Sequence, residues 1–328
     1  MCTAIYCKGI RPIFGRTLDF ERSFGESALV TPRRCNLSFK YLEQQSEHFA
    51  IVGIGTVKNG MPLYFDALNE CGLAAAALNF PKSAVYLLPT ADKLNLASFE
   101  LIPWILSNAC SVTEAEALLS RINITNDSVS AELPATPMHW MFADKERAIV
   151  AEPSSQGLMI YNNELSVLTN EPPFPCHLQN VIECMGASPY YPSNKIAPSL
   201  ELSHISTGHG SSVLPGGHSS SARFVRAVFA NEHCEAIDDE TGSVNRFFHI
   251  TECVSVPLGC IKNENGKSVM TLYTSCADIL SSTYYFSTYS SRRIKALELN
   301  KISLDSRYLL SFDMQTDEDI SYILKSNL

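Results

Sequence analysis

Several common sequence signatures are missing from this chain of 328 residues. The 11 cysteines form no C-x-x-C pair, which argues against a zinc ribbon and against a thioredoxin-type redox motif. No apolar run reaches the roughly 18 residues that a membrane-spanning helix needs, so we expect no membrane partner. With only 16 Gly and 17 Pro, collagen-like and low-complexity chains are excluded as well.

Positive charge is also scarce. The chain has 25 Lys and Arg against 34 Asp and Glu, and it gathers no basic stretch of the kind that binds phosphates, so nucleic acid is not an expected partner. The start, Met1-Cys2-Thr3-Ala4, lacks the basic and apolar segments of a secretory signal. We therefore expect a cytoplasmic protein in which ten of the cysteines are small buried hydrophobic residues.

What is present is a succession of short strands and amphipathic helices, and the hydrophobic fraction of 45% is enough for a large core. Strand patterns cover 3–7, 13–16, 28–32, 49–57, 73–80, 138–143, 147–152, 157–161, 165–169, 254–261, 269–275, 282–288 and 293–299. Helical patterns cover 98–121, a segment that begins after Ser219 or Ser220, and 242–253. This order predicts layered sheets with helices outside. Because no linker separates two self-sufficient patterns, we expect a single domain over residues 1–328.

One segment does not fit an ordinary connection. Residues 186–221 are rich in Pro, Gly, Ser and His. Long loops of this kind in compact domains are often functional.

Cys2 is the first candidate for chemistry. Removal of Met1 would give this residue both a thiol and a free α-amine, whose ordinary pKa values, about 8.5 and about 8, both lie near neutrality. A neutral amine can accept the thiol proton and later deliver it to a leaving amine, so nucleophile and base would come from one residue. The alternative is that a cysteine at the second position is an accident of sequence.

Charged residues near the thiol would support this chemistry. Arg16 and Asp19 lie three residues apart in the second strand pattern, where the carboxylate could hold an ammonium and the guanidinium could favour a thiolate. Arg223 lies early in a largely apolar helix, and an inward-facing arginine would need a partner. The alternatives are a surface ion pair for the first two residues and a solvated helix face for Arg223.

Two asparagines are candidate oxyanion donors. Asn170 follows a strand pattern, where its amide could donate to an oxyanion, and Asn79 has a similar position in Ala77-Leu78-Asn79-Phe80-Pro81. Both precede prolines, so ordinary turn residues are the alternative.

Together these segments resemble the choloylglycine hydrolase family of bile salt hydrolases and penicillin V acylases. The resemblance extends over nearly the whole chain. It is carried by Met1-Cys2-Thr3-Ala4, Phe14-Gly15-Arg16-Thr17-Leu18-Asp19, Asn69-Glu70-Cys71-Gly72-Leu73, Ala77-Leu78-Asn79-Phe80-Pro81, residues 97–106, Leu168-Thr169-Asn170-Glu171-Pro172, Leu214-Pro215-Gly216-Gly217, residues 220–226 and residues 284–289.

The resemblance implies an α+β fold, namely the four-layered αββα sandwich of N-terminal nucleophile hydrolases with mostly antiparallel sheets. It implies that Cys2 is the nucleophile and, through its amine, the base, that Asp19 orients the amine, and that Asn170 and the Asn79 backbone N–H bind the oxyanion. Arg16 and Arg223 match the arginines around the thiol. The family needs no metal and no cofactor, and its members suggest a bacterial homotetramer.

Substrate preference rests on a few positions. Phe20 and Phe24 suggest a large apolar acyl group such as a steroid, and Phe65 and Leu133 are further candidates for the apolar wall, although all four could pack in the core. Asn79 favours bile salt hydrolases over penicillin V acylases, which often carry an aromatic residue there.

We therefore expect a small-molecule hydrolase that cleaves glycine- or taurine-conjugated bile acids. A penicillin V acylase is the alternative enzyme. A non-catalytic steroid- or acyl-binding protein is the alternative from another class, and for it Cys2 would be dispensable. A papain-like Cys–His hydrolase is disfavoured, because none of the 8 histidines sits in a recognisable motif.

Overall fold

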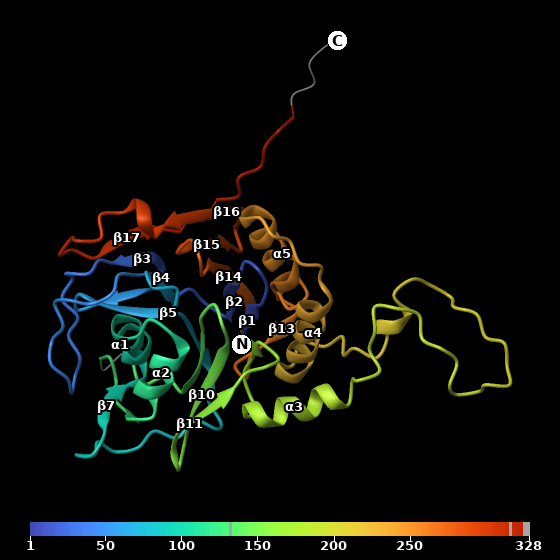
Figure 1. The fold of residues 1–328 in the computed structure, drawn as a ribbon, viewed down its shortest axis with the longest axis horizontal. Coiled ribbons are helices and arrows are strands. Elements are labelled where there is room, and N and C mark those ends of the chain that lie inside the picture. Colours follow the sequence, from blue (N-terminus) through green and yellow to red (C-terminus); the bar gives the residue numbers. More distant parts are fainter. Residues whose placement is uncertain (131–132, 315–316, 324–328) are drawn as a thin grey trace, which may run out of the picture.

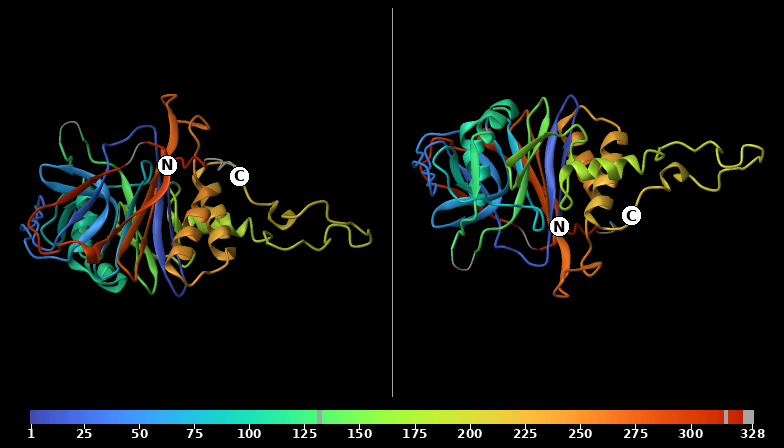
Figure 2. Two further views of the ribbon diagram at one scale, coloured as in Figure 1. Left: turned by 90° about the horizontal axis from the view of Figure 1, so that it is seen from above. Right: turned by 90° about the horizontal axis from the view of Figure 1, so that it is seen from below.

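The computed structural model describes residues 1–130, 133–314 and 317–323. Two β-sheets lie face to face, and helices cover the outer face of each one (Figure 1 and Figure 2). None of the described helices is long and apolar enough to span a bilayer.

The first sheet holds the N-terminus of the chain. Its central path runs β12 (Val167–Leu168), β1 (Cys2–Cys7), β2 (Ile13–Phe20), β14 (Ser268–Asp278), β15 (Thr283–Thr288) and β16 (Ser291–Glu298), with β13 (Ile261–Lys262) paired to β14. These pairs are all antiparallel. β1 is therefore an interior strand, and its first residue is Cys2.

The second sheet is also antiparallel. Its strands run in the order β11 (Gly157–Asn162), β10 (Ala148–Ser154), β9 (Met138–Ala143), β6 (Ala74–Asn79), β5 (Met61–Asn69), β4 (Ile51–Lys58), β3 (Ser27–Thr31) and β17 (Leu310–Asp313). A separate parallel pair joins β7 (Leu94–Ala97) to β8 (Ile122–Thr125).

The helices complete the four layers. α1 (Leu101–Asn108) and α2 (Val112–Leu119) pack on the second sheet, and α4 (Ser220–His233) and α5 (Glu240–Glu252) pack on the first. α3 (Phe174–Ile182) lies against α4. Short 3-10 turns are η1 (Ser98–Glu100), η2 (His209–Ser211) and η3 (Leu299–Lys301). The layers thus follow the order α, β, β, α.

β6 shows how the core forms. Successive side chains of a strand point to opposite faces, and here Ala74, Ala76 and Leu78 join the core shared with the first sheet, whereas Ala75 and Ala77 join the core under α1 and α2. Both faces are buried, which is why this strand reads as a continuous apolar run.

Several sequence-based boundaries are wrong. The predicted helix over 98–121 is split, because Ser111 starts a new helix by accepting a hydrogen bond from the Glu114 backbone N–H at 3.2 Å. The predicted strand over 254–261 is a turn that leads to the two-residue strand β13. The sequence patterns also missed β5, which is buried on both faces for most of its length, and α3.

The cysteine prediction holds only in part. Cys7, Cys35 and Cys276 are buried free thiols as expected. Cys71 and Cys110 instead form a disulfide that joins the β5–β6 turn to the segment between α1 and α2. Cys176 and Cys260 are exposed. The expectation of ten small buried hydrophobic residues is therefore wrong for the disulfide pair and for the exposed thiols.

Candidate active site

Cys2 lies at the start of β1 and its side chain is only 5% exposed. Its backbone nitrogen donates to Oδ1 of Asn170 at 2.8 Å, and its carbonyl accepts a hydrogen bond from Arg223 Nη1 at 2.5 Å. Met1 precedes it in this structure, so the Cys2 nitrogen is a peptide nitrogen here. The thiol-bearing residue is therefore held at both backbone ends by residues distant in the sequence.

Arg16 approaches the same residue from β2, the strand that pairs with β1. It is fully buried, and its Nη1 donates to the carbonyls of Ala77 at 2.6 Å and Phe65 at 3.2 Å in the second sheet. Nη2 has no hydrogen-bond partner among the residues described. Burial acts to lower the pKa of Arg16, but negative charge at Cys2 and at nearby acidic groups outweighs it and raises that pKa. The guanidinium is therefore a fixed positive charge near the thiol.

Arg223 is the second fully buried guanidinium, and it reaches the site from α4. Besides the Cys2 carbonyl it contacts Thr3 Oγ1 at 2.6 Å and Asn170 Oδ1 at 2.8 Å. Burial lowers the pKa of Arg223, and negative charge at Asp19 and Cys2 acts in the opposite direction. Its buried position confirms that this arginine faces inward and not solvent.

Asn170 follows β12 and connects three parts of the site. Its Oδ1 accepts from the Cys2 nitrogen and from Arg223, and its Nδ2 donates to the Asn79 carbonyl at 2.8 Å. An amide NH₂ has two hydrogens, so, as far as the described residues show, one N–H beyond the bond to Asn79 is left for another acceptor beside Cys2. Asn79 ends β6 and contacts Asn170 through its backbone carbonyl.

Asp19 is buried on β2 and meets the N-terminal segment through its backbone. Its carbonyl accepts from the Met1 amino group at 2.7 Å, and its N–H donates to the Met1 carbonyl at 2.9 Å. Within the described residues, its carboxylate accepts hydrogen bonds from the hydroxyls of Thr271 at 2.7 Å and Thr17 at 3.4 Å, not from the Cys2 nitrogen.

Three of the four predicted substrate residues gather beside the site. The ring centroids of Phe20 and Phe24 are 4.7 Å apart, and those of Phe24 and Phe65 are 5.4 Å apart. Phe65 also supplies a carbonyl to Arg16, which connects this aromatic cluster to the charged residues. Leu133 lies in a turn of its own, where its backbone pairs with Val129 and Ser130.

Sequence reasoning missed residues that fix this arrangement. Ser220 accepts the Asn170 N–H at 2.8 Å, and Thr271 holds Asp19. Ser220 stood out only as a possible helix cap, and Thr271 lies in a strand pattern with no distinguishing feature. No group of three or more His, Cys, Asp or Glu side chains that could hold a metal ion is found over the described ranges.

Comparison with known proteins identifies the family of the chain. A model of the linear amide C–N hydrolases, choloylglycine hydrolase family, matches residues 2–312. A bile salt hydrolase/transferase of Lactiplantibacillus plantarum is 39% identical over 317 residues, which cover 97% of this chain and 98% of the relative. One from Clostridium perfringens is 31% identical over 329 residues, covering 98% of this chain and 100% of the relative.

Solved structures agree as well. The mutant C2A conjugated bile acid hydrolase from Clostridium perfringens has a TM-score of 0.91 at 30% identity, covering 99% of this chain and 100% of the other. A penicillin V acylase from Agrobacterium tumefaciens, at 19% identity and a TM-score of 0.74 over 95% and 90% of the two chains, shares the fold. The four-layered αββα fold of N-terminal nucleophile hydrolases is thus confirmed. The chain belongs to the choloylglycine hydrolase family of linear amide C–N hydrolases.

Proposed function

We propose that the protein is a bile salt hydrolase, which cleaves the amide bond of glycine- or taurine-conjugated bile acids to free bile acid and amino acid. The observation that carries this proposal is the meeting of Cys2, Asn170 and two buried arginines beside an aromatic cluster. Relatives named bile salt hydrolase/transferase and conjugated bile acid hydrolase cover nearly the full chain.

In the proposed reaction, Met1 is first removed, and the Cys2 nitrogen becomes an α-amine. The amine takes the thiol proton, and the thiolate attacks the amide carbonyl carbon. When the tetrahedral intermediate collapses, the C–N bond breaks, the amine returns its proton to the departing nitrogen, and a thioester remains. Water, deprotonated by the same amine, then attacks the thioester, which releases the carboxylic acid and restores the thiol.

The surrounding groups have distinct roles in this proposal. Arg16 and Arg223 are proposed to complement the negative charge of the attacking sulfur, since both guanidinium groups are fully buried and Arg223 binds the Cys2 carbonyl. Asp19, fixed by Thr271, offsets the charge of Arg223 and orients the α-amine.

The oxyanion is assigned to Asn170 and Asn79. The second N–H of the Asn170 amide donates to the developing negative charge, and the backbone N–H of Asn79 completes the hole. Loss of one such donor typically costs about 100- to 1000-fold in kcat.

Phe20, Phe24 and Phe65 are proposed to contact the acyl group, because their clustered rings offer apolar surface next to Arg16. Leu133 is proposed as a more peripheral wall residue. A steroid acyl group fits an apolar aromatic surface, and Asn79 also favours bile salts over penicillin V.

We further propose that residues 1–328 form one domain and that the enzyme is a homotetramer of the bacterial cytoplasm. One core contains residues from β1 near the start and η3 near the end of the chain, Cys2 and Leu299 among them, which supports the single domain. The assembly arm, defined as residues 183–219 between α3 and α4, extends away from the sheets (Figure 1 and Figure 2) and carries exposed Ile196 and Ile205, which supports assembly with other copies.

The test is hydrolysis of glycocholate, taurocholate and penicillin V by the purified protein and by Cys2→Ala, with Cys35→Ala as the control for a buried cysteine far from the site. We expect bile salt turnover by the unchanged protein and by Cys35→Ala, and none by Cys2→Ala. Faster turnover of penicillin V would favour the acylase alternative, and no turnover of any substrate would favour a binding protein. Intact mass checks the removal of Met1, without which the Cys2 amine does not exist.

A further inference from the structure

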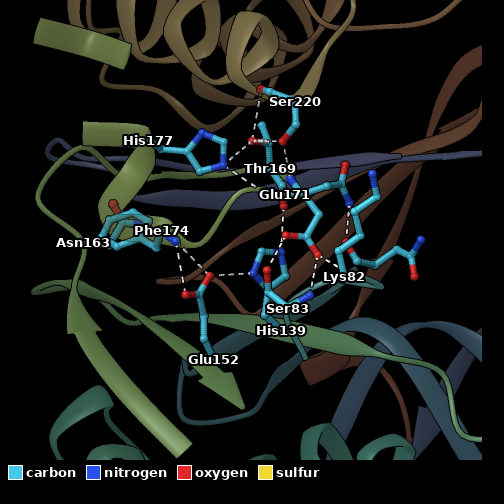
Figure 3. A network of polar contacts seen from close by, with 12 residues as sticks. Lys82, Ser83, His139, Glu152, Asn163, Thr169, Glu171, Phe174, His177 and Ser220 are labelled. Atoms are coloured by element: carbon cyan, nitrogen blue, oxygen red, sulfur yellow. Dashed lines mark hydrogen bonds and ion pairs between the residues drawn. The ribbon is translucent and has the colours of Figure 1, made fainter. Parts of the chain in front are cut away.

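The peptide that carries Asn170 is held by side chains and not by a neighbouring strand. β12 ends at Leu168, and side chains bind three successive backbone polar groups from the Thr169 carbonyl to the Asn170 carbonyl (Figure 3). The Thr169 carbonyl accepts from His139 Nε2 at 2.8 Å, the Asn170 N–H donates to Ser220 Oγ at 2.8 Å, and the Asn170 carbonyl accepts from His177 Nε2 at 2.9 Å. Two histidines therefore bind two consecutive carbonyls.

The hydrogen on each Nε2 follows from its partner. A backbone carbonyl can only accept, so His139 and His177 both carry a hydrogen on Nε2. For His177, Nδ1 is buried without a hydrogen-bond partner among the described residues. An N–H at Nδ1 would lack an acceptor among the described residues, so these contacts favour the tautomer with its hydrogen on Nε2, and burial lowers the pKa of His177 in the same direction. Its single N–H donates to the Asn170 carbonyl at 2.9 Å, and Thr169 Oγ1 is a longer second contact of Nε2 at 3.4 Å.

His139 is fixed from the opposite side. Its Nδ1 lies 2.9 Å from Glu152 Oε1, and since Nε2 already donates to Thr169, this contact needs a further proton between ring and carboxyl. Glu152 also accepts the N–H of Phe174 at 3.1 Å, the first residue of α3. His139 is therefore fixed between the start of α3 and the Asn170 peptide.

Each histidine ring stacks on a phenylalanine that directly follows another site residue. His139 lies parallel to Phe80, with centroids 4.2 Å apart and planes 7° apart, and Phe80 follows Asn79. His177 stacks on Phe224 at 4.5 Å and 13°, and Phe224 follows Arg223. The Asn170 side chain contacts Asn79 and Arg223. The two histidines thus connect the Asn170 peptide to the segments that carry both of these residues.

We propose that His139 and His177 are positioning residues that aim the Asn170 amide at the oxyanion, and this inference rests on the function proposed above. Neither ring touches the Cys2 thiol or the substrate in this scheme. They act by fixing the carbonyls on each side of the Asn170 Cα, which sets the direction of its side chain. Glu171 supports the same geometry, since its carboxylate accepts the N–H groups of Lys82 at 2.7 Å and Ser83 at 2.9 Å, just beyond Asn79 (Figure 3).

The effect should fall on the transition state. A misplacement of about 1 Å at a catalytic group can cost about 100-fold in rate, and an oxyanion donor acts mainly after attack has begun. Loss of the His177 N–H should therefore lower kcat and leave KM nearly unchanged.

The test compares His177→Phe, which keeps the stack on Phe224 but lacks the donor, with His177→Gln, which keeps an N–H donor. We expect His177→Phe to lower kcat on glycocholate about 10- to 100-fold with KM within about twofold, and His177→Gln to recover most of the loss. His48→Phe is the matched control, because His48 also binds backbone carbonyls, those of Cys35 at 2.7 Å and Phe49 at 2.8 Å, away from the site. It should leave kcat unchanged.

A double-mutant cycle separates positioning from general damage. In an Asn170→Ala background, His177→Phe should have almost no further effect on kcat, because its action passes through Asn170. Additive losses, or equal losses in His177→Phe and His177→Gln, would overturn the proposal. If His177→Phe does not fold, Phe224→Leu removes only the ring that orients His177 and enters the same cycle.

One readout needs no substrate. The ¹⁵N spectrum of the His177 imidazole should show a neutral ring with its hydrogen on Nε2, and a hydrogen on Nδ1 would contradict the assignment. A failure to hydrolyse any amide would thus count against the proposed function, whereas a wrong tautomer or an unchanged kcat in His177→Phe would count against positioning alone.

Discussion

The surroundings of Cys2 and the assembly arm depart from the usual distribution of side chains in opposite directions. Near Cys2, Arg16 and Arg223 are fully buried, although arginine is seldom found in protein interiors. In the arm, Ile196 and Ile205 are 93% and 94% exposed. Charged groups are thus buried around Cys2, and apolar side chains are exposed in the arm. Each arrangement lowers the stability of the folded chain unless other groups bind the charges or cover the apolar side chains.

The partners differ in kind. The buried arginines find most of their partners within the chain, namely the carbonyls of Ala77 and Cys2 and the Asn170 amide, and among the described residues only Nη2 of Arg16 is left without one. The isoleucines of the arm have no comparable cover in the subunit. The site residues thus contact one another within one subunit, whereas the exposed isoleucines of the arm are what the proposed assembly would cover.

The largest effect is expected at α4, which meets both regions. Arg223 binds the Cys2 carbonyl, and Arg226, three residues on, binds the carbonyls of Cys253 at 3.0 Å and Pro215 at 2.7 Å, the latter near the end of the arm. Arg223→Met should lower kcat/KM by at least about 100-fold, since a fixed charge beside the thiol and Asn170 is lost. Steady-state kinetics on glycocholate measure this.

Arg226→Met is the matched control, because burial lowers the pKa of both arginines and both lie on one helix. It should retain kcat/KM to within about threefold, as expected of a residue that does not touch the reacting groups. An equal loss in both variants would show that the two regions are not separate.

The second effect concerns assembly. If the proposed tetramer assembles through the arm, replacing Ile196 and Ile205 together by serine should convert it to smaller species, because the apolar area available for association is removed. Sedimentation velocity measures the change. Leu88→Ser is the control, since Leu88 is also exposed but lies outside the arm. An unchanged tetramer in the arm variant would exclude the arm from the subunit interface.

The residues around Cys2 were predictable from the sequence to different degrees. Cys2, Arg16 and Asn170 could be singled out because they lie in short motifs, and the fold followed from the family that those motifs resemble. His139 and His177 could not, because hydrophobic periodicity reports local faces and not the long-range approach of β9 and α3 to Asn170. The disulfide between Cys71 and Cys110 was not predicted for the same reason, since its two cysteines belong to different layers of the fold.

A moderate effect is expected at the edge of the site. Phe24→Ala should raise KM for bile salts about threefold to tenfold with little change in kcat, because about 1 kcal/mol of apolar contact with the acyl group is lost. Phe312→Ala on β17 is a matched control, as the two phenylalanines are 37% and 39% exposed. A fall in kcat without a change in KM would contradict the assignment of Phe24 to substrate binding.

The smallest effect is a pH dependence of stability that distinguishes buried from surface carboxylates. Asp66 lies between the sheets and accepts hydrogen bonds from Tyr273 at 2.6 Å, Ser275 at 2.7 Å and Tyr284. Burial raises the pKa of Asp66 more than Arg16 and these hydroxyls lower it. The folded state therefore binds this proton more tightly than the unfolded state, so the contribution of Asp66 to stability falls as pH rises above about 4.

Glu70 should behave in the opposite way. Burial acts to raise its pKa, but hydrogen bonds from Arg33 and the Ala50 N–H outweigh burial and lower it, so its contribution is present at neutral pH and is lost as pH falls through the folded pKa. Urea unfolding of Asp66→Asn and Glu70→Gln between about pH 3 and pH 7 measures both, because the contribution of Glu70 changes only below its unfolded pKa of about 4.5. The free energy of unfolding of the unchanged protein minus that of the variant should decrease with rising pH for Asp66→Asn and increase for Glu70→Gln. If both differences changed in the same direction, burial would not destabilise the charged form of Asp66.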